Sequence, residues 1–176
     1  MAGEREMRNE RRMSDVEALM WNLEKDPYLA SSFANVTLLD QPPDPDRLRA
    51  RLAHAVSVVP RLRHRVAPAL GRLAPPEWQD DPNFDLDYHI RHVALPPPGS
   101  LEQLSDLVGR LMSRPLDHGR PLWELYLIEG IEDDRGAVFV KSHHAAVDGV
   151  AAVGLVGALC DLSEDAPPPP PPDTPC

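Results

Sequence analysis

A predicted strand that ends in two adjacent histidines constrains this chain more than any other feature. Residues 138–142 read VFVKS, and their β-branched and aromatic members are typical of a buried strand. His143 and His144 follow directly, and Asp148 and Gly149 then open a long apolar segment. Successive strand side chains face opposite ways, so only one imidazole of the pair can face a cleft. Because an imidazole titrates near neutral pH, that histidine is a candidate for accepting and returning a proton.

The His-His-x-x-x-Asp-Gly pattern leaves three interpretations open when it is taken alone. In the first, one histidine is a general base and the other packs against it or orients it. In the second, both histidines are ordinary residues that precede a helix capped by Asp148, and Gly149 permits a close backbone turn. In the third, His143, His144 and Asp148 bind a metal. Adjacent strand residues diverge and no cysteine or further histidine lies nearby at ligand spacing, which disfavours the metal.

A second segment, one predicted hairpin before the histidines, strengthens the catalytic interpretation. Residues 114–128 contain a Pro-Leu-Trp tripeptide, and shorter stretches at 60–65 and 84–92 add to the pattern. From about Met13 to Leu162 the chain resembles the wax ester synthase/diacylglycerol acyltransferase family, within the chloramphenicol-acetyltransferase-like superfamily. The motifs that carry the resemblance are HHxxxDG at His143, His144, Asp148 and Gly149, and PLW at Pro121, Leu122 and Trp123.

The resemblance implies a fold and a reaction. The implied fold is α/β of the α+β kind, a mixed β-sheet flanked by helices that forms one half of a two-domain enzyme with a tunnel between its domains. The implied reaction transfers a fatty acyl group from acyl-CoA, as co-substrate, to diacylglycerol or a long-chain alcohol. No other cofactor and no metal are implied.

The resemblance also assigns the site residues. His144 is the implied general base and His143 an accessory residue. Asp148 and Gly149 are implied to be structural. The substrate pocket is implied to be shaped by Pro121, Leu122 and Trp123.

The length of the chain leaves two classes of function open. Family members are more than twice as long, and their second domain supplies the other wall of the tunnel. We therefore expect a disordered leader at 1–12, an acyltransferase N-terminal domain at 13–163 and a proline-rich linker at 164–176, with the second domain absent. The first class is an acyltransferase that works with a separate C-terminal half. The second is a catalytically inactive fragment or binding subunit.

A peptide condensation domain shares the histidine motif, but the PLW segment disfavours it.

The overall charge excludes some partners. The chain has 28 acidic against 18 basic residues and a net charge of −10, which argues against nucleic acid. No apolar run reaches 18 residues, and the charged N-terminus is no secretion signal. We expect a cytoplasmic protein with its two cysteines, Cys160 and Cys176, reduced. Peripheral contact with a membrane or lipid droplet stays open.

Periodicity predicts the elements that surround the motif. Helices are predicted after caps at Ser14, Asp44 and Ser100, and a buried one over 149–162. Strands are predicted at 33–39, 84–93, 122–131 and 136–142, the last two joined by a loop at 132–136 that uses Gly136. Along 122–131, alternation predicts that Trp123 shares one face with Leu125 and Leu127 and lies in the core, with Leu122, Glu124, Tyr126 and Ile128 on the other face.

Two regions carry more specific expectations. Alternation over 84–93 predicts that His89 lies on a polar face, and 75–82 is predicted to be a turn-rich connection around Trp78. Arg61, Arg63 and Arg65 are predicted to form a solvated basic face, with binding of coenzyme A phosphates as the alternative.

Overall fold

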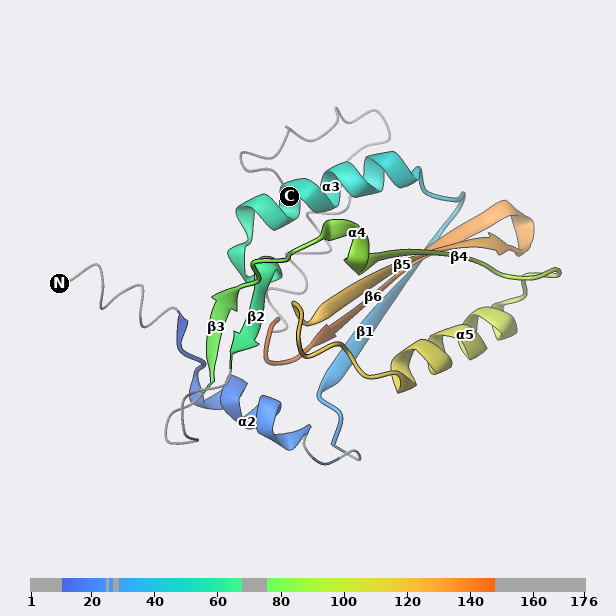
Figure 1. The fold of residues 1–176 in the computed structure, drawn as a ribbon. Helices are drawn as coiled ribbons and strands as arrows, with labels where there is room; N and C mark the ends of the chain where they lie inside the picture. The colour runs from blue at the N-terminus through green and yellow to red at the C-terminus, as the bar shows by residue number, and fades with distance from the viewer. Residues whose placement is uncertain (1–10, 25, 27–28, 68–75, 148–176) are drawn as a thin grey trace.

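A computed structural model describes residues 11–24, 26, 29–67 and 76–147 (Figure 1). Four sequence-based predictions lie outside these residues. They are the first ten residues of the leader, the helix at 149–162, the proline-rich segment at 164–176 with its cysteine, and the structural roles of Asp148 and Gly149. Cys160 belongs to the segment 149–162 and therefore also lies outside the described residues.

The described part is built on one mixed four-stranded sheet. Its strands lie in the order β1 (Ser32–Leu39), β6 (Arg135–His143), β5 (Trp123–Ile131) and β4 (Ile90–Ala94). β6 runs antiparallel to both of its neighbours, whereas β4 runs parallel to β5. Beside this sheet, β2 (His64–Ala67) and β3 (Glu77–Asp80) form a separate antiparallel pair. The predicted fold class, a mixed sheet with flanking helices, is confirmed.

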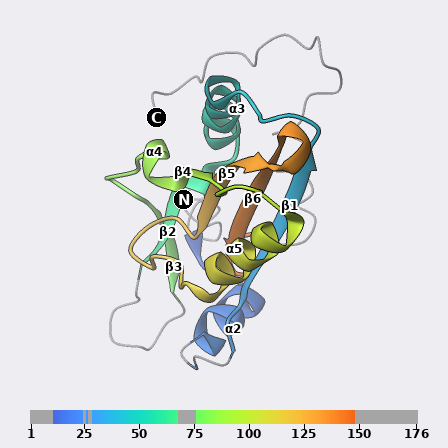
Figure 2. The ribbon, with the colours of Figure 1, turned by 90° about the vertical axis from the view of Figure 1, so that its right-hand side faces the viewer.

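Helices cover both faces of the large sheet. Figures 1 and 2 show α3 (Pro45–Val58) on one side of it and α5 (Leu101–Ser113) on the other. Trp123, Leu125 and Leu127 pack in the core that contains the α3 residues. Tyr126 and Ile128 pack in the core that contains the α5 residues. The predicted alternation along β5 is confirmed, and burial on both faces explains why this strand is almost continuously apolar.

The predicted caps start the three helices. α2 (Asp15–Leu23) begins with a capping box in which Ser14 and Glu17 bond each other's backbone N–H. Ser100 and Gln103 form the same arrangement at α5. Asp44 accepts from two N–H groups at the start of α3, where Pro45 occupies the first helical turn. The 3-10 helix η1 (Pro60–Arg63) follows α3.

The prediction of one strand over 84–93 is wrong. Asp85 accepts a hydrogen bond of 3.0 Å from the N–H of Asp87, which starts the single helical turn α4 (Leu86–His89). β4 begins only at Ile90. The helical turn rotates the side chain of His89 inward, so that it is 1% exposed instead of lying on a polar face.

Two connections also differ from their predictions. The segment 75–82 contains strand β3, whose Trp78 is 0% exposed and lies opposite Val66 of β2. In the hairpin between β5 and β6, the left-handed residues are Asp133 and Asp134 of the 3-10 helix η3 (Glu132–Asp134). Gly136 lies within β6 instead, where a Cβ atom would come 2.7 Å from the Cα of Pro42.

No helix within the described ranges has the length and apolar character needed to span a membrane.

Lys141 connects the centre of the sheet to α5. Its side chain is 1% exposed, and its ammonium group donates to the backbone oxygens of Leu111, Met112 and Arg114 at the end of that helix. A cation is favoured at a helix C-terminus, where carbonyl groups lack helical partners. Burial lowers the pKa of Lys141, and the carboxylates of Glu124 and Glu24 oppose that shift.

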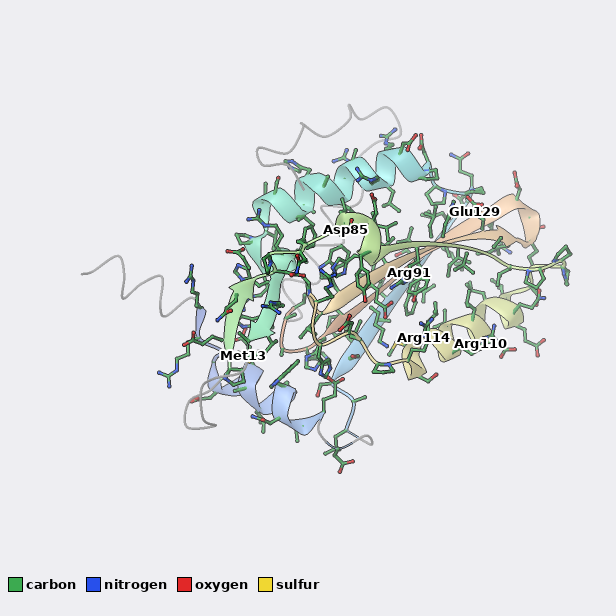
Figure 3. All side chains as sticks on the ribbon, in the orientation of Figure 1. Met13, Asp85, Arg91, Arg110, Arg114 and Glu129 are labelled. Atoms are coloured by element: carbon green, nitrogen blue, oxygen red, sulfur yellow. The ribbon has the colours of Figure 1, made fainter. Side chains whose placement is uncertain are left out.

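We expect Lys141→Met to lower the free energy of unfolding by about 2–3 kcal/mol, because it removes a buried donor from three carbonyl groups. Arg110→Met is the matched control, since Arg110 is exposed in the last turns of the same helix (Figure 3). The control should change the free energy by no more than about 0.5 kcal/mol. Urea denaturation of each variant measures the difference, and equal losses in the two would contradict the role given to Lys141.

Candidate functional site

The two histidines at the end of β6 face opposite ways. His143 is 0% exposed, whereas His144 is exposed. The imidazole of His144 lies against the ring of Phe33 on β1, with 4.5 Å between ring centroids. Its backbone N–H donates to the oxygen of Ser31 at 2.8 Å. His144 therefore combines an accessible ring with a fixed backbone.

A tight turn follows the strand. The backbone oxygen of His143 accepts from the N–H of Ala146 at 2.9 Å and from that of Val147 at 3.2 Å. The N–H of His143 donates to the oxygen of Leu122 at 3.1 Å, which ties the turn to the PLW segment. Since Asp148 and Gly149 lie outside the described residues, their structural roles stay predictions.

The imidazole of His143 is held at both nitrogens. Nδ1 accepts the N–H of Ala145 at 2.9 Å, and Nε2 lies 2.8 Å from Oε2 of Glu24. A neutral imidazole carries one proton, so the proton is on Nε2, which donates to the carboxylate. Burial lowers the pKa of His143, and the Glu24 carboxylate opposes that shift.

The same carboxylate oxygen has a second partner. His118 Nε2 lies 3.0 Å from Oε2 of Glu24, and the His118 ring lies 4.6 Å from that of Trp21 on α2. His118 borders a cavity of about 350 Å³ that is also lined by Ser32, Met112 and Lys141. The buried end of the histidine motif is thus linked through Glu24 to a cavity beside it.

The PLW segment is buried next to the histidine motif. Leu122 is 1% exposed and packs in the cluster that contains Trp78. Trp123 lies opposite Ser142 in the sheet register, and its Nε1–H donates to the oxygen of Leu62 at 2.8 Å. The predicted placement of Trp123 in the core is confirmed. A role of Pro121, Leu122 and Trp123 in shaping the substrate pocket stays a prediction.

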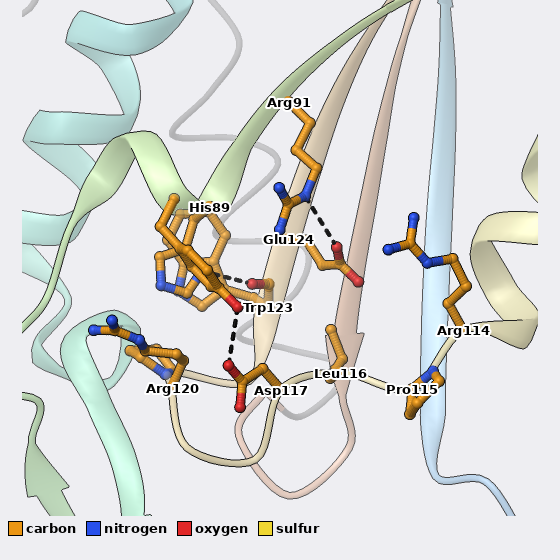
Figure 4. A pocket seen from close by; sticks show the side chains of 11 residues that line it. His89, Arg91, Arg114, Pro115, Leu116, Asp117, Arg120, Trp123 and Glu124 are labelled. Atoms are coloured by element: carbon orange, nitrogen blue, oxygen red, sulfur yellow. Dashed lines mark hydrogen bonds and ion pairs between the residues drawn. The ribbon is translucent and has the colours of Figure 1, made fainter.

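Pro121 and Trp123 line a cavity of about 50 Å³ with charged walls (Figure 4). Arg91 lies 3.6 Å from Glu124, and the hydroxyl of Tyr88 donates to Asp117 at 2.9 Å. Arg120 donates to the carboxylate of Asp81 at 3.2 Å and also to the backbone oxygen of Asn83. These contacts pair most of the charges in the wall, so we assign it a structural role.

His89 also lines this cavity. Its ring stacks on Trp123 at 4.5 Å and on Phe84 at 5.5 Å, and Nδ1 donates to the oxygen of Trp123 at 2.8 Å. Within the described ranges, Nε2 has no hydrogen-bond partner. Burial lowers the pKa of His89. We therefore describe it as a neutral core histidine.

The basic stretch is more closely packed than predicted. Arg61 lies over the ring of Trp78 at 4.3 Å and 3.5 Å from the Glu17 carboxylate, and its side chain is 29% exposed. Burial lowers its pKa. The prediction of a solvated basic face is wrong for Arg61, because this residue joins α2 to β3. Binding of coenzyme A phosphates by the stretch stays a prediction.

Sequence reasoning missed Glu24, His118 and Lys141. Glu24 and His143 are 119 positions apart, so no local pattern could connect them. Of these three residues, only Lys141 carried a signal in the sequence. It is a lysine in a predicted buried strand, between two apolar residues and the histidines. Among the described residues, no three histidine, cysteine, aspartate or glutamate side chains gather in a way that could hold a metal ion.

Comparison with known proteins gives a consistent family. Residues 13–176 match the model of the wax ester synthase/diacylglycerol acyltransferase catalytic domain. The probable diacylglycerol O-acyltransferase tgs3 of Mycobacterium tuberculosis is 48% identical over 109 residues, 62% of this chain and 40% of its own. The putative diacylglycerol O-acyltransferase Rv2484c of the same species is 39% identical over 160 residues, 89% of this chain and 33% of its own. The chain thus spans 40% or less of the length of these two relatives.

Solved structures agree with the sequence matches. The wax ester synthase/diacylglycerol acyltransferase of Marinobacter aquaeolei VT8 is 32% identical, with a TM-score of 0.66 over 81% of this chain and 36% of that one. The starter condensation domain of the rhizomide synthetase RzmA is 14% identical, with a TM-score of 0.68 over 85% of this chain and 36% of that one. The second likeness concerns the fold alone.

We expect protonation of His89 to destabilise the fold. Its pKa is lowered in the folded state, so its contribution to stability is complete above the unfolded pKa of about 6.5 and is lost as the pH falls through the folded value. Wild-type protein should therefore lose stability between about pH 7.5 and 5.5, and His89→Phe should lose less over the same range. Urea denaturation at both pH values measures this.

Phe84→Leu is the control for the stacking contact. It removes one ring that packs on His89 but leaves the titratable group in place. Its free energy of unfolding should be lower than that of the wild type by similar amounts at the two pH values. Identical pH dependence in wild type and His89→Phe would contradict the assignment.

Proposed function

The chain belongs to the wax ester synthase/diacylglycerol acyltransferase family, and we propose that it supplies the half of an O-acyltransferase that carries the general base. The proposed reaction moves a fatty acyl group from acyl-CoA to diacylglycerol or a long-chain alcohol. The proposed partner is a C-terminal half that completes the enzyme. The observation that carries the proposal is the geometry of His144, an exposed imidazole on a fixed backbone at the end of a buried strand.

Both substrates are proposed from the relatives. The two mycobacterial relatives are named diacylglycerol O-acyltransferases, and the Marinobacter relative is named a wax ester synthase/diacylglycerol acyltransferase. A variant of the RzmA condensation domain, which shares the fold, was solved in complex with C8-CoA. These names support an acyl-CoA donor and a lipid hydroxyl acceptor.

We assign the proton transfers to His144. Its imidazole removes the proton of the acceptor hydroxyl as the oxygen attacks the thioester carbonyl. The tetrahedral intermediate then collapses with cleavage of the carbon–sulfur bond, and the imidazolium returns its proton to the coenzyme A thiolate. One histidine serves both steps, so the mechanism needs no covalent acyl-enzyme.

The exposure of His144 fits a base that lies between two walls. A base must reach its substrate within hydrogen-bond distance, and His143 cannot do so because it is fully buried. Closure by a second wall would orient the substrates and exclude water that would hydrolyse the thioester. Exposed apolar residues on α2, Val16 and Leu19, support peripheral contact with lipid or with that second wall.

An inactive binding subunit is the second candidate. It is favoured by one observation: neither cavity described above is lined by His144. A reconstitution experiment separates the two functions.

We expect turnover when this chain is mixed with a polypeptide that corresponds to the C-terminal half of a family member. Release of coenzyme A from a fatty acyl-CoA, in the presence of a long-chain alcohol or diacylglycerol, measures it. His144→Ala should lower the rate at least about 100-fold, because general-base help is lost. His92→Ala is the control, since His92 pairs with Glu129 on the exposed side of β4 and should leave the rate unchanged. Full activity of His144→Ala would contradict the mechanism, and inactivity of every mixture would favour the binding subunit.

A further inference from the structure

We propose that Glu24 is a positioning residue that fixes the tautomer of His143 and, through it, the turn that carries His144. This inference rests on the proposed function, since it assigns a role toward the same base. Its structural part, the state of His143, can be tested without any turnover.

The Glu24 carboxylate is well placed to accept a hydrogen bond from the histidine motif. Glu24 follows α2 directly as its C-cap residue, and its side chain is 15% exposed. Oε2 lies 2.8 Å from Nε2 of His143, which is 0% exposed. A carboxylate is an acceptor only, so it selects the imidazole form that has its proton on Nε2.

That choice of tautomer decides what Nδ1 can do. With the proton on Nε2, Nδ1 presents a lone pair to the N–H of Ala145 at 2.9 Å. With the proton on Nδ1 instead, two donors would face each other in a buried place, and both would lose a partner. Ala145 is the residue after His144, so this one bond fixes the backbone on the far side of the base.

α2 also holds the near side of the base. The hydroxyl of Ser31 donates to the oxygen of Met20 in α2 at 3.1 Å, and the oxygen of Ser31 accepts from the N–H of His144 at 2.8 Å. The peptide groups on both sides of the His144 side chain are therefore linked to the C-terminal part of α2. The link runs through Ser31 on one side and through Glu24 and His143 on the other.

The geometry separates positioning from proton relay. Nδ1 of His143 is occupied by a backbone N–H, and the ring of His144 lies on the opposite side against Phe33. No hydrogen bond of the described residues connects Glu24 to the His144 ring. Glu24 therefore determines the orientation of His144. Its replacement should change kcat rather than the KM for acyl-CoA.

His118 is the outer partner of Glu24 and provides an internal comparison. It donates to the same oxygen at 3.0 Å, but its side chain is 44% exposed and it borders the larger cavity. Loss of His118 leaves the bond between Glu24 and His143 in place. Loss of Glu24 removes the acceptor from a fully buried donor.

Imidazole nitrogen spectra of the ¹⁵N-labelled chain test the structural part. We expect His143 as the neutral Nε2–H tautomer in wild type, in Glu24→Gln, whose amide oxygen still accepts, and in His118→Ala. In Glu24→Ala the buried Nε2–H loses its acceptor, so the Nδ1–H form should appear as the bond from the Ala145 N–H breaks, and the Ala145 amide should exchange with solvent faster. Glu129→Ala is the matched control, because it removes an exposed histidine–carboxylate pair with His92 at the other end of β4 and β5 (Figure 3).

Several outcomes would overturn the proposal. They are a wild-type His143 that is protonated on Nδ1 or is a cation at neutral pH, and an Ala145 amide in Glu24→Ala that exchanges as slowly as in wild type. The wild-type spectrum and Glu24→Gln decide the matter even if Glu24→Ala fails to fold.

The reconstituted enzyme tests the functional part. Glu24→Ala should lower kcat about 10- to 100-fold with little change in the KM for acyl-CoA, because the base is displaced while the substrate contacts remain. Glu24→Gln should restore most of kcat. A rise in KM alone, or no rescue by glutamine when the tautomer is retained, would refute positioning. Lack of turnover in the wild-type mixture would instead count against the proposed function, and the spectra would still decide the role of Glu24.

Discussion

The burial of β5 and β6 on both faces of the sheet determines where the histidine motif lies. Side chains along these strands alternate between the core under α3 and the core under α5. At the C-terminal end of β6 this alternation places His143 inside and leaves His144 on the other side, next to Phe33 of the edge strand β1. The separation of an orienting histidine from an accessible one therefore follows from the architecture of the sheet.

Backbone groups supply most hydrogen bonds of the buried Lys141, His89 and His143 side chains, and this limits which of them can do chemistry. Lys141 donates to three helix-terminal carbonyls, and His89 donates to the oxygen of Trp123. His143 uses one nitrogen for a backbone N–H and the other for Glu24. An imidazole that is engaged in this way orients its neighbours and cannot meet a substrate. Among the histidines of the motif, His144 alone keeps a ring without a polar contact among the described residues, and this is the physical reason for assigning the base to it.

The sequence was sufficient where the determining contacts are local or periodic. Capping boxes at Ser14 and Ser100 predicted two helix starts, and alternation along β5 predicted which face Trp123 occupies. Prediction failed where two local patterns compete, as at His89, where the cap at Asp85 turned an apparent strand into a helical turn. It failed again where the constraint is tertiary: Gly136 was expected in the turn, but it is needed because Pro42 approaches β6. Glu24 could not be found at all, since its partner lies 119 positions away.

The proposed catalysis requires a second polypeptide to cover the site, whereas the contacts that hold His143 lie within this chain. The sheet ends at β1, an edge strand with exposed Val36 and Leu38, and α2 next to it exposes Val16 and Leu19. An edge strand and an apolar helix surface are both able to receive another polypeptide. The tautomer of His143, in contrast, is set by contacts that all lie within the described residues. The orientation of the base can therefore precede assembly, while acyl transfer requires a second wall to exclude water from the thioester. In this view the chain holds a base that is positioned in advance, and the partner surface decides whether it meets a substrate.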